Sequence, residues 1–296
     1  MSDDYGVRRP PRTERLTVRG LEHQLTLWGE PSDSPIVLLH GFMDAGPTWQ
    51  FLVDCLPDSW SCVAPDWRGF GASERPAGGY WFPDYLADLE GLLSVLVPKG
   101  RARVIAHSMG GNIASLYAGI RPHRLSWLAN LEGLGLPRTA PELAPLRYAQ
   151  WLEQLEKQLQ ERHYNSLDVL AGLLVLRNPR LSMPNARFIA KAWTRAAGSG
   201  IELASDPQHS RLNPVLYRRE EAEACWRRIE IPMLLLIGEL SEHATRLAAD
   251  GTHDYLQAAF PTARIVTLAG LGHMMHHEDP QAVASQILQF AAQCGP

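Results

Sequence analysis

The sequence is poor in cysteine, which excludes the small extracellular scaffolds that depend on disulfides. Its 296 residues include only Cys55, Cys62, Cys225 and Cys294, and none of these forms a C-x-x-C pair. Four cysteines are far too few to staple a chain of this length. We therefore expect reduced thiols that are mostly structural.

Long apolar runs and an excess of basic charge are also lacking. The longest apolar runs, such as residues 231–237, are far too short to span a bilayer, and the first residues, MSDDYGVRRPPRTER, lack the apolar stretch of a secretory signal. The chain has 28 Lys and Arg against 32 Asp and Glu, so nothing in its charge favours a phosphate backbone. We expect a cytoplasmic protein that binds neither membranes nor nucleic acid.

The composition is otherwise that of an ordinary globular protein. Hydrophobic residues make up 45% of the chain and charged residues 20%, which is enough to bury a substantial core. At roughly 150 residues per domain, this length allows one large domain or a domain with a sizeable insertion. No internal repeat or low-complexity tract interrupts the chain.

Short apolar segments alternate with helical ones over much of the chain. The pattern predicts strands at residues 16–19, 21–28, 36–39, 62–64, 103–106, 125–131, 232–237 and 264–268, and helices at residues 49–56, 83–97, 112–120 and 280–292. Continuous apolar strands separated by helices indicate an α/β fold with a mostly parallel sheet covered on both faces. Ligands then bind at the carboxyl ends of the strands.

The alternation pauses between residues 131 and 232. Tyr148, Trp151, Leu152, Leu155 and Leu159 recur there at three- and four-residue spacing, which predicts one apolar face of a helix. More helical stretches follow to about residue 228, with Pro and Gly punctuation between them. We interpret residues 137–228 as a mostly helical cap, inserted into a core formed by residues 1–136 and 229–296.

One serine lies where a strand passes directly into a helix. The predicted strand at residues 103–106 runs into His107-Ser108-Met109-Gly110-Gly111, and helical sequence follows. This is the pattern of a nucleophile elbow, a tight turn that lifts a serine hydroxyl above the sheet and needs small residues two before and two after it. Ala106 and Gly110 meet that need. Ser108 is therefore a candidate nucleophile.

A serine hydroxyl needs a general base within hydrogen-bond reach. His273 lies in the loop after the last predicted strand, in the stretch AGLGHMMHHEDP, and is the candidate base. His276 and His277 follow closely. No cysteine or carboxylate motif accompanies them, so we expect them at a helix start or at the rim of the site, with no metal bound.

Two backbone amides are candidates for stabilising a developing oxyanion. One comes from the residue after the nucleophile, Met109, and the other from the loop after the strand at residues 36–39, where Phe42 follows His40-Gly41. The glycine lets this loop approach a bound carbonyl group.

With these motifs, the sequence resembles the α/β-hydrolase fold family over nearly its whole length. The motifs occur in the family's order: His40-Gly41-Phe42, Asp66-Trp67-Arg68-Gly69-Phe70-Gly71-Ala72-Ser73, His107-Ser108-Met109-Gly110-Gly111 and Gly270-Leu271-Gly272-His273. The capped layout and the GLGLP segment after Glu132 are similar to the branch called serum hydrolase-like proteins. The resemblance implies hydrolysis, usually of an ester.

The acid of a Ser-His-acid triad is the open point. Asp66 precedes the serine, whereas this fold places the acid between serine and histidine, so we assign Asp66 to a turn. Many relatives carry the acid three residues beyond a glycine after the cap, but here Gly238 is followed at that distance by Ser241. Glu242 and Glu132 are the alternatives. We favour Glu132, because it directly follows an apolar strand and so emerges at the active edge of the sheet.

Aromatic residues in the edge loops and the cap favour an apolar or aromatic substrate group. Trp49 and Trp67 from the loops and Trp151 from the cap are the candidate substrate-binding residues. Serine, imidazole and fixed dipoles can supply the whole reaction, so we expect no metal and no organic cofactor.

These observations lead to a serine hydrolase, with a carboxylesterase acting on a small to medium ester as the first hypothesis. Carbon-carbon bond hydrolases, thioesterases and acyltransferases use the same triad and stay as alternatives, because these motifs do not specify the bond. A different alternative is a ligand-binding receptor with slow turnover. All of these imply a small-molecule substrate or ligand, and the sequence leaves the oligomeric state open.

Overall fold

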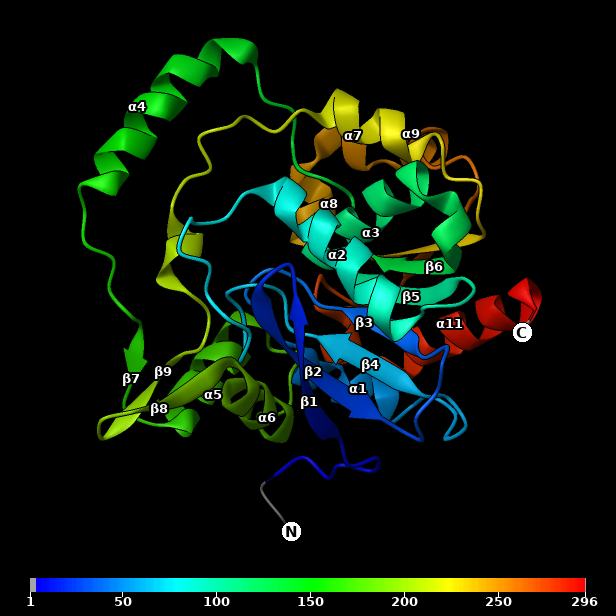
Figure 1. Ribbon diagram of the computed structural model, residues 1–296, viewed down its shortest axis with the longest axis horizontal. Helices are drawn as coiled ribbons and strands as arrows, with labels where there is room; N and C mark the ends of the chain where they lie inside the picture. Colours follow the sequence, from blue (N-terminus) through cyan, green and yellow to red (C-terminus); the bar gives the residue numbers. More distant parts are fainter. Residues whose placement is uncertain (1–3, 296) are drawn as a thin grey trace.

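The structure is a computed structural model that describes residues 4–295 (Figure 1). Its centre is a sheet of eight strands in the order β1-β2-β4-β3-β5-β6-β10-β11. Their bounds are β1 Arg12–Val18, β2 Leu21–Trp28, β3 Ile36–Leu39, β4 Cys62–Pro65, β5 Ala102–His107, β6 Leu125–Leu131, β10 Met233–Gly238 and β11 Ala263–Leu268. Within this sheet β2 pairs antiparallel with both β1 and β4, and the other neighbouring strands pair parallel. The predicted, mostly parallel sheet is confirmed.

Helices cover both faces of this sheet. Figure 1 shows α2, α3 and α7 on one side and α11 on the other. The helices are α1 Gln50–Val53, α2 Phe82–Leu96, α3 Met109–Ile120, α4 Ala144–Leu155, α5 Leu167–Arg177, α6 Met183–Trp193, α7 Arg219–Trp226, α8 Glu242–Arg246, α9 His253–Ala259, α10 Met275–Glu278 and α11 Pro280–Cys294. The crossovers between parallel strands place helices on the faces, as parallel pairing requires.

Strand residues alternate between two apolar cores because successive side chains point to opposite faces. On β5, Val104 belongs to the core under α2, α3 and α7, whereas Ile105 belongs to the core under α1 and α11. Both side chains are fully buried. This double burial explains why the central strands appear in the sequence as continuous apolar runs and not as alternating ones.

The chain between β6 and β10 contains α4 to α7 and a small antiparallel sheet in the order β7-β9-β8. These strands are β7 His163–Tyr164, β8 Thr194–Ala197 and β9 Gly200–Leu203. Most of the segment's regular structure is helical, but the small sheet is not anticipated by the sequence pattern. Its β8–β9 hairpin turns at a glycine, Gly198, whose positive φ favours that residue.

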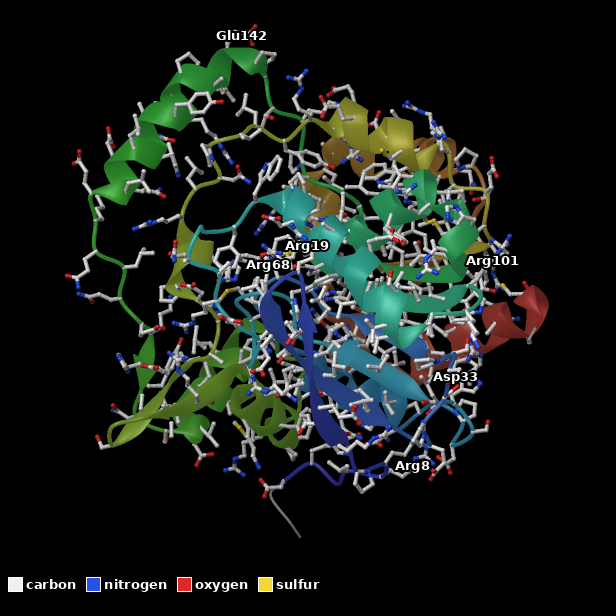
Figure 2. All side chains as sticks on the ribbon, in the orientation of Figure 1. Arg8, Arg19, Asp33, Arg68, Arg101 and Glu142 are labelled. Carbon is white, nitrogen blue, oxygen red and sulfur yellow. The ribbon has the colours of Figure 1, made fainter. Side chains whose placement is uncertain are left out.

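Parts of this segment pack against the core and one part does not. Helices α5 and α6 share an apolar cluster with Phe51 of α1. Helix α4 has no buried residue, and Figure 1 shows it standing apart from the main sheet. Glu142, near its start, lies at the periphery in Figure 2.

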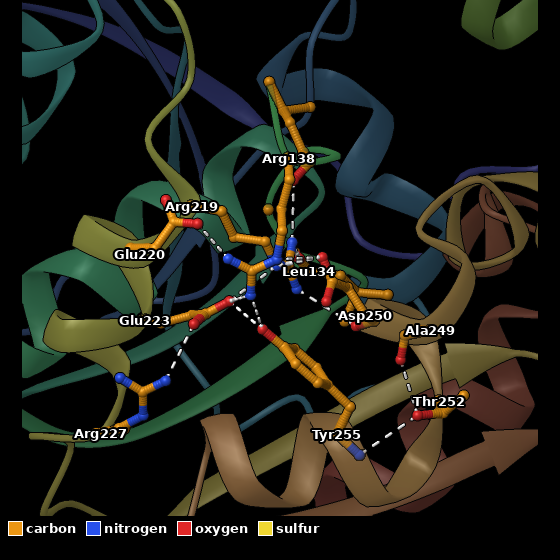
Figure 3. Close-up of polar contacts among 12 residues, drawn as sticks. Leu134, Arg138, Arg219, Glu220, Glu223, Arg227, Ala249, Asp250, Thr252 and Tyr255 are labelled. Carbon is orange, nitrogen blue, oxygen red and sulfur yellow. Dashed lines mark hydrogen bonds and ion pairs between the residues drawn. The ribbon is translucent and has the colours of Figure 1, made fainter. Parts of the chain in front are cut away.

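A buried arginine anchors the chain that returns from this segment (Figure 3). Arg219 of α7 is fully buried and donates hydrogen bonds to the carbonyl oxygens of Leu134 and Leu136, each at 3.0 Å. It also pairs with Glu223 at 3.1 Å and Asp250 at 3.3 Å. The network holds α7 against the backbone that follows β6. The first of its contacts, Leu134, is two residues beyond Glu132.

Two other arginines bind one buried carboxylate on helix α2. Arg19 and Arg68 lie side by side in Figure 2, and both bind the buried carboxylate of Asp88 on α2. Arg68 approaches Asp88 through two nitrogens, at 2.5 and 2.6 Å. A buried carboxylate needs such charged donors because its desolvation is costly.

No helix within residues 4–295 combines the length and the apolar character needed to cross a bilayer.

Candidate active site

Ser108 occupies a strained turn between β5 and α3. Its φ of 49° is rare for a residue with a side chain, and Met109 is already the first residue of α3. A Cβ atom added at Gly110 would lie 2.4 Å from the carbonyl oxygen of Leu39, so only glycine fits there. The turn has the conformation expected of a nucleophile elbow.

His273 lies in the loop between β11 and α10 and points at this serine. Its Nε2 is 3.0 Å from Oγ of Ser108. The loop is held from two sides, because Gly272 donates its N–H to Glu278 at 2.7 Å and Nε2 of His107 lies 2.9 Å from the His273 carbonyl oxygen. The imidazole therefore has a fixed position relative to the hydroxyl.

Glu132 completes a continuous chain of hydrogen bonds. Its Oε2 lies 2.5 Å from Nδ1 of His273. A carboxylate only accepts, so Nδ1 carries the proton and Nε2 is left to accept one from Ser108. Glu132 is fully buried at the end of β6, and its φ of 54° turns the side chain toward the imidazole.

Two further donors hold the Glu132 carboxylate. The Gly238 N–H donates to Oε1 at 2.6 Å, and the Ser241 hydroxyl donates to Oε2 at 2.6 Å. Ser241 stands where the family pattern would place an aspartate. The sequence shows that departure, but only the structure shows that the serine supports a carboxylate that comes from β6.

Glu242 lies away from the imidazole. Its side chain is 86% exposed and pairs with Arg246 at 3.3 Å along α8. It borders an open depression that is lined by residues of the β10–α8 region and includes none of Ser108, Glu132 and His273. Of the two alternative acids, the structure brings only Glu132 to His273.

The loop after β3 lies directly against the serine. A Cβ atom added at Gly41 would be 3.2 Å from the Ser108 Cβ and 2.7 Å from Nδ1 of His107. The buried His40 accepts the Trp67 N–H at Nε2 and binds its neighbour's carbonyl oxygen through Nδ1, which fixes the loop. This brings the Phe42 segment close to the start of α3, where the Met109 N–H is one of those that the helix leaves unpaired.

Asp66 has the structural position that the sequence predicts. Its carboxylate accepts the N–H of Gly46 at 2.6 Å and of Ala72 at 2.9 Å, and so closes turns on either side of it. Burial raises the pKa of this carboxyl.

Of the three predicted substrate-binding tryptophans, two lie in the core of the protein and one lies on helix α4. Trp49 and Trp67 are fully buried within the two cores of the sheet and have no accessible surface to offer a ligand. The sequence pattern could not distinguish loop aromatics that face a pocket from those that fill the core. Trp151 lies on α4, which packs no residue into the core.

A cavity of about 200 Å³ lies between the loop after Phe42 and the segment that follows β6. Met43, Asp44 and Trp193 line it, together with leucines of α5 and the arginines Arg162 and Arg177, whereas Ser108, Glu132 and His273 are not among its lining residues. Trp193 also donates its indole N–H to Asp44 at 2.7 Å, which ties α6 to this loop. The wall is thus mixed and not purely aromatic.

Of the two positions expected for His276 and His277, the helix start is confirmed and the rim is wrong. Both are on the short helix α10, with side chains 0% and 1% exposed, and both face the carboxylate of Asp44. Burial lowers the pKa of His276 below its usual value and the pKa of His277 to about 3. Sequence reasoning missed Asp44 because more than two hundred residues separate it from these histidines.

Two other histidines surround the site as neutral groups. Burial lowers the pKa of His243 to about 4, and its ring centroid lies 5.0 Å from that of His273. Burial also lowers the pKa of His107 well below 6.5. His273 is therefore surrounded by neutral imidazoles and has one carboxylate partner.

Comparisons with known proteins agree with this architecture. A family model described as "alpha/beta hydrolase fold" matches residues 34–280. A serine hydrolase-like protein of Danio rerio is 26% identical over 96% of this chain and 89% of its own length. An uncharacterized protein of Mycobacterium tuberculosis is 33% identical over 95% of this chain and 81% of its own.

Solved structures show the same fold. The thioesterase domain from the curacin biosynthetic pathway superposes with a TM-score of 0.80 at 24% identity, covering 94% of this chain and 99% of that one. The matched family region contains the β3 loop, the serine elbow and the histidine loop. The resemblance inferred from the four ordered motifs is confirmed, and the chain is a hydrolase that belongs to the α/β-hydrolase fold family.

Proposed function

We propose that the protein is a serine carboxylesterase in which Ser108 is the nucleophile, His273 the general base and Glu132 the triad acid. The observation that carries this proposal is the unbroken path from Glu132 Oε2 through both ring nitrogens of His273 to Ser108 Oγ, with steps of 2.5 and 3.0 Å. Both lengths lie within hydrogen-bond range, as a nucleophile and its base require.

The geometry assigns a role to each group. His273 Nε2 takes the Ser108 proton as Oγ attacks the ester carbonyl, and the resulting imidazolium is stabilised by Glu132. The amides of Phe42 and Met109 hold the oxyanion. The imidazolium then protonates the leaving alcohol, and a water activated by the same imidazole hydrolyses the acyl-enzyme and frees Ser108.

The segment at residues 137–228 acts as the cap in this proposal. It contributes Trp193 and the leucines of α5 to the 200 Å³ cavity beside the Phe42 loop. A cavity of that size suits a small acyl or alkyl group, because pockets for larger ligands are roughly 300–1,000 Å³. Met43 and the leucines supply the apolar part of this mixed wall, which suits the apolar group of a small ester.

Steady-state hydrolysis of p-nitrophenyl butyrate tests this function. The wild type should turn over repeatedly, and Ser108→Ala should lower kcat by a factor on the order of 10⁴ or more. Ser94→Ala, on the outer face of α2, is the matched control and should keep full activity, since Ser94 bonds only to Glu90 of its own helix.

A protein that binds the ester without hydrolysing it would give a different result. A ligand-binding receptor would show a rise in Tm with the ester or its product but no turnover beyond one equivalent. That outcome, or equal activity of Ser108→Ala and wild type, would exclude the esterase. Parallel assays with a thioester and a β-diketone identify the bond that is cleaved.

A further inference from the structure

A buried carboxylate close to the proposed triad has one oxygen fully satisfied and the other without a hydrogen bond. Oδ1 of Asp44 accepts the Ala45 N–H at 2.9 Å, the Thr48 hydroxyl at 2.8 Å and the Trp193 indole at 2.7 Å. Three donors on one oxygen indicate the ionised form. Oδ2 has no hydrogen-bond partner among the described residues, although the side chain is only 1% exposed.

Histidine nitrogens surround this free oxygen. Nε2 of His276 and Nε2 of His277 each lie 3.7 Å from Oδ2, too far for a hydrogen bond. Both nitrogens, and Nδ1 of His107, also lack partners within residues 4–295. All three rings are buried, and none of these nitrogens donates a hydrogen bond to the free oxygen of Asp44.

The spacing of these atoms fits a small cation. Ligand atoms of Asp44, His107 and His276 all lie within 4.8 Å of one another, and all three residues are buried. Tetrahedral Zn²⁺, with bonds of roughly 2.0–2.1 Å, holds its ligand atoms about 3.4 Å apart. The 3.7 Å between His276 Nε2 and Asp44 Oδ2 is close to that spacing, and His107 lies within 4.8 Å of both, so side-chain movement of about 1 Å would bring the three together.

The surroundings of His107 match those of a metal ligand. A ligating histidine nearly always donates its second ring N–H to a carboxylate or a backbone carbonyl, which fixes the tautomer. Nε2 of His107 lies 2.9 Å from the His273 carbonyl oxygen, which leaves Nδ1 with its lone pair free.

We propose that Asp44, His107 and His276 form a binding site for a divalent transition-metal ion such as Zn²⁺. One carboxylate and two imidazoles are ligands that Zn²⁺ favours, and sites with three protein ligands leave the fourth position to water. The ion would neutralise the buried charge of Asp44 and satisfy nitrogens that the fold leaves unpaired. Asp44 also lines the cavity beside the Phe42 loop.

Equilibrium dialysis of the full chain against Zn²⁺, after EDTA treatment and desalting, tests the site without any substrate. We expect one Zn²⁺ per chain and a Tm that rises with free Zn²⁺. Binding should weaken at least tenfold in His276→Gln and, separately, in Asp44→Asn. His253→Gln, which removes a largely exposed imidazole, is the control and should bind like the wild type.

Co²⁺ replacement separates this site from the free thiols. Ligation by nitrogen and oxygen gives the visible bands of tetrahedral Co²⁺ without the thiolate charge-transfer band that Cys55, Cys225 or Cys294 would add. Absence of Zn²⁺ binding, a thiolate spectrum, or undiminished binding in His276→Gln and Asp44→Asn would overturn the proposal.

A consequence for activity rests on the proposed function. Nε2 of His107 lies 2.9 Å from the His273 carbonyl oxygen and the two ring centroids are 4.8 Å apart, so a shift of His107 onto an ion disturbs the loop that positions His273. Zn²⁺ should therefore inhibit p-nitrophenyl butyrate hydrolysis, and the half-inhibiting concentration should rise at least tenfold in His276→Gln. Inhibition of the same strength in His276→Gln and wild type would disprove this coupling. If the protein has no esterase activity at all, the proposed function fails, and equilibrium dialysis still shows whether the metal site exists.

Discussion

At the scale of single residues, the proposed triad acid shows how a departure from a family pattern can be compensated. Ser241 stands at the position of the usual aspartate, and the structure connects its hydroxyl to Glu132 at 2.6 Å. Because Glu132 also binds His273, a glutamate on β6 and a serine after β10 together occupy the place of one aspartate. The position of Glu132 could be predicted from the sequence, because a residue that ends an apolar strand emerges at the sheet's active edge.

Glu132→Gln should lower kcat by a factor on the order of 10⁴ while the protein stays folded, because an amide cannot stabilise the imidazolium and leaves Nδ1 in the wrong tautomer. Glu242→Gln is the control and should keep wild-type kcat, since its side chain is 86% exposed and pairs only with Arg246. Steady-state kinetics with p-nitrophenyl butyrate and a Tm for each variant check both expectations. If the Glu242 variant loses activity and the Glu132 variant keeps it, the acid is assigned wrongly.

A double variant sharpens that test. Ser241→Asp added to Glu132→Gln returns a carboxylate to within reach of the imidazole, so part of the lost kcat should be recovered. A merely structural role for Glu132 predicts no such rescue.

At the scale of elements, the elbow depends on close backbone contacts that a sequence pattern indicates only indirectly. Gly110 is in α3, yet its missing side chain leaves room for the carbonyl oxygens of Leu39 and His40. The sequence suggests a small residue there, and the contact with the β3 loop becomes visible only in three dimensions. The pairing of β7 with β9 and the buried Asp44–His276 contact were missed for the same reason, since both join residues far apart in the chain.

Gly110→Ala should destabilise the protein by about 1–3 kcal/mol, because its Cβ would press on backbone that cannot move aside. Gly172→Ala is the matched control within α5, where nothing lies within 4 Å of an added Cβ. That change should stabilise the fold by about 0.5–1 kcal/mol, the helix propensity gain of alanine. Urea unfolding of both variants measures the difference, and equal shifts would contradict the close-contact explanation.

At the scale of the whole molecule, buried and partly buried neutral histidines lie around the loops at the carboxyl ends of the strands. His209 stacks on Phe70 with a centroid distance of 3.8 Å, and burial lowers its pKa from 6.5 to about 4. The α/β class and the order of the core elements could be predicted from periodicity, because each strand and helix repeats a local pattern. The neutral state of these histidines could not, because it depends on which distant rings enclose them.

Stability should consequently fall in acid. A histidine whose folded pKa is depressed contributes fully above the unfolded value of 6.5, and loses that contribution as the pH falls toward 4, because the unfolded chain takes up the proton first. For His209 the loss amounts to about 3 kcal/mol at most. Urea unfolding between pH 7 and 4, with EDTA present, should show a shallower loss in His209→Gln than in wild type. If stability falls with pH as steeply in His209→Gln as in wild type, this explanation is contradicted. The control variant His253→Gln should show the wild-type pH dependence of stability.

The most direct test of the proposed esterase is intact-mass analysis after exposure to a fluorophosphonate, which reacts with activated serines whatever the natural substrate. The Ser108–His273–Glu132 arrangement predicts one adduct per chain, mapped to the peptide that contains Ser108 and lost in Ser108→Ala. Folded wild-type protein that forms no adduct, or an adduct that persists in Ser108→Ala, would contradict an activated Ser108 and with it the proposed hydrolytic function.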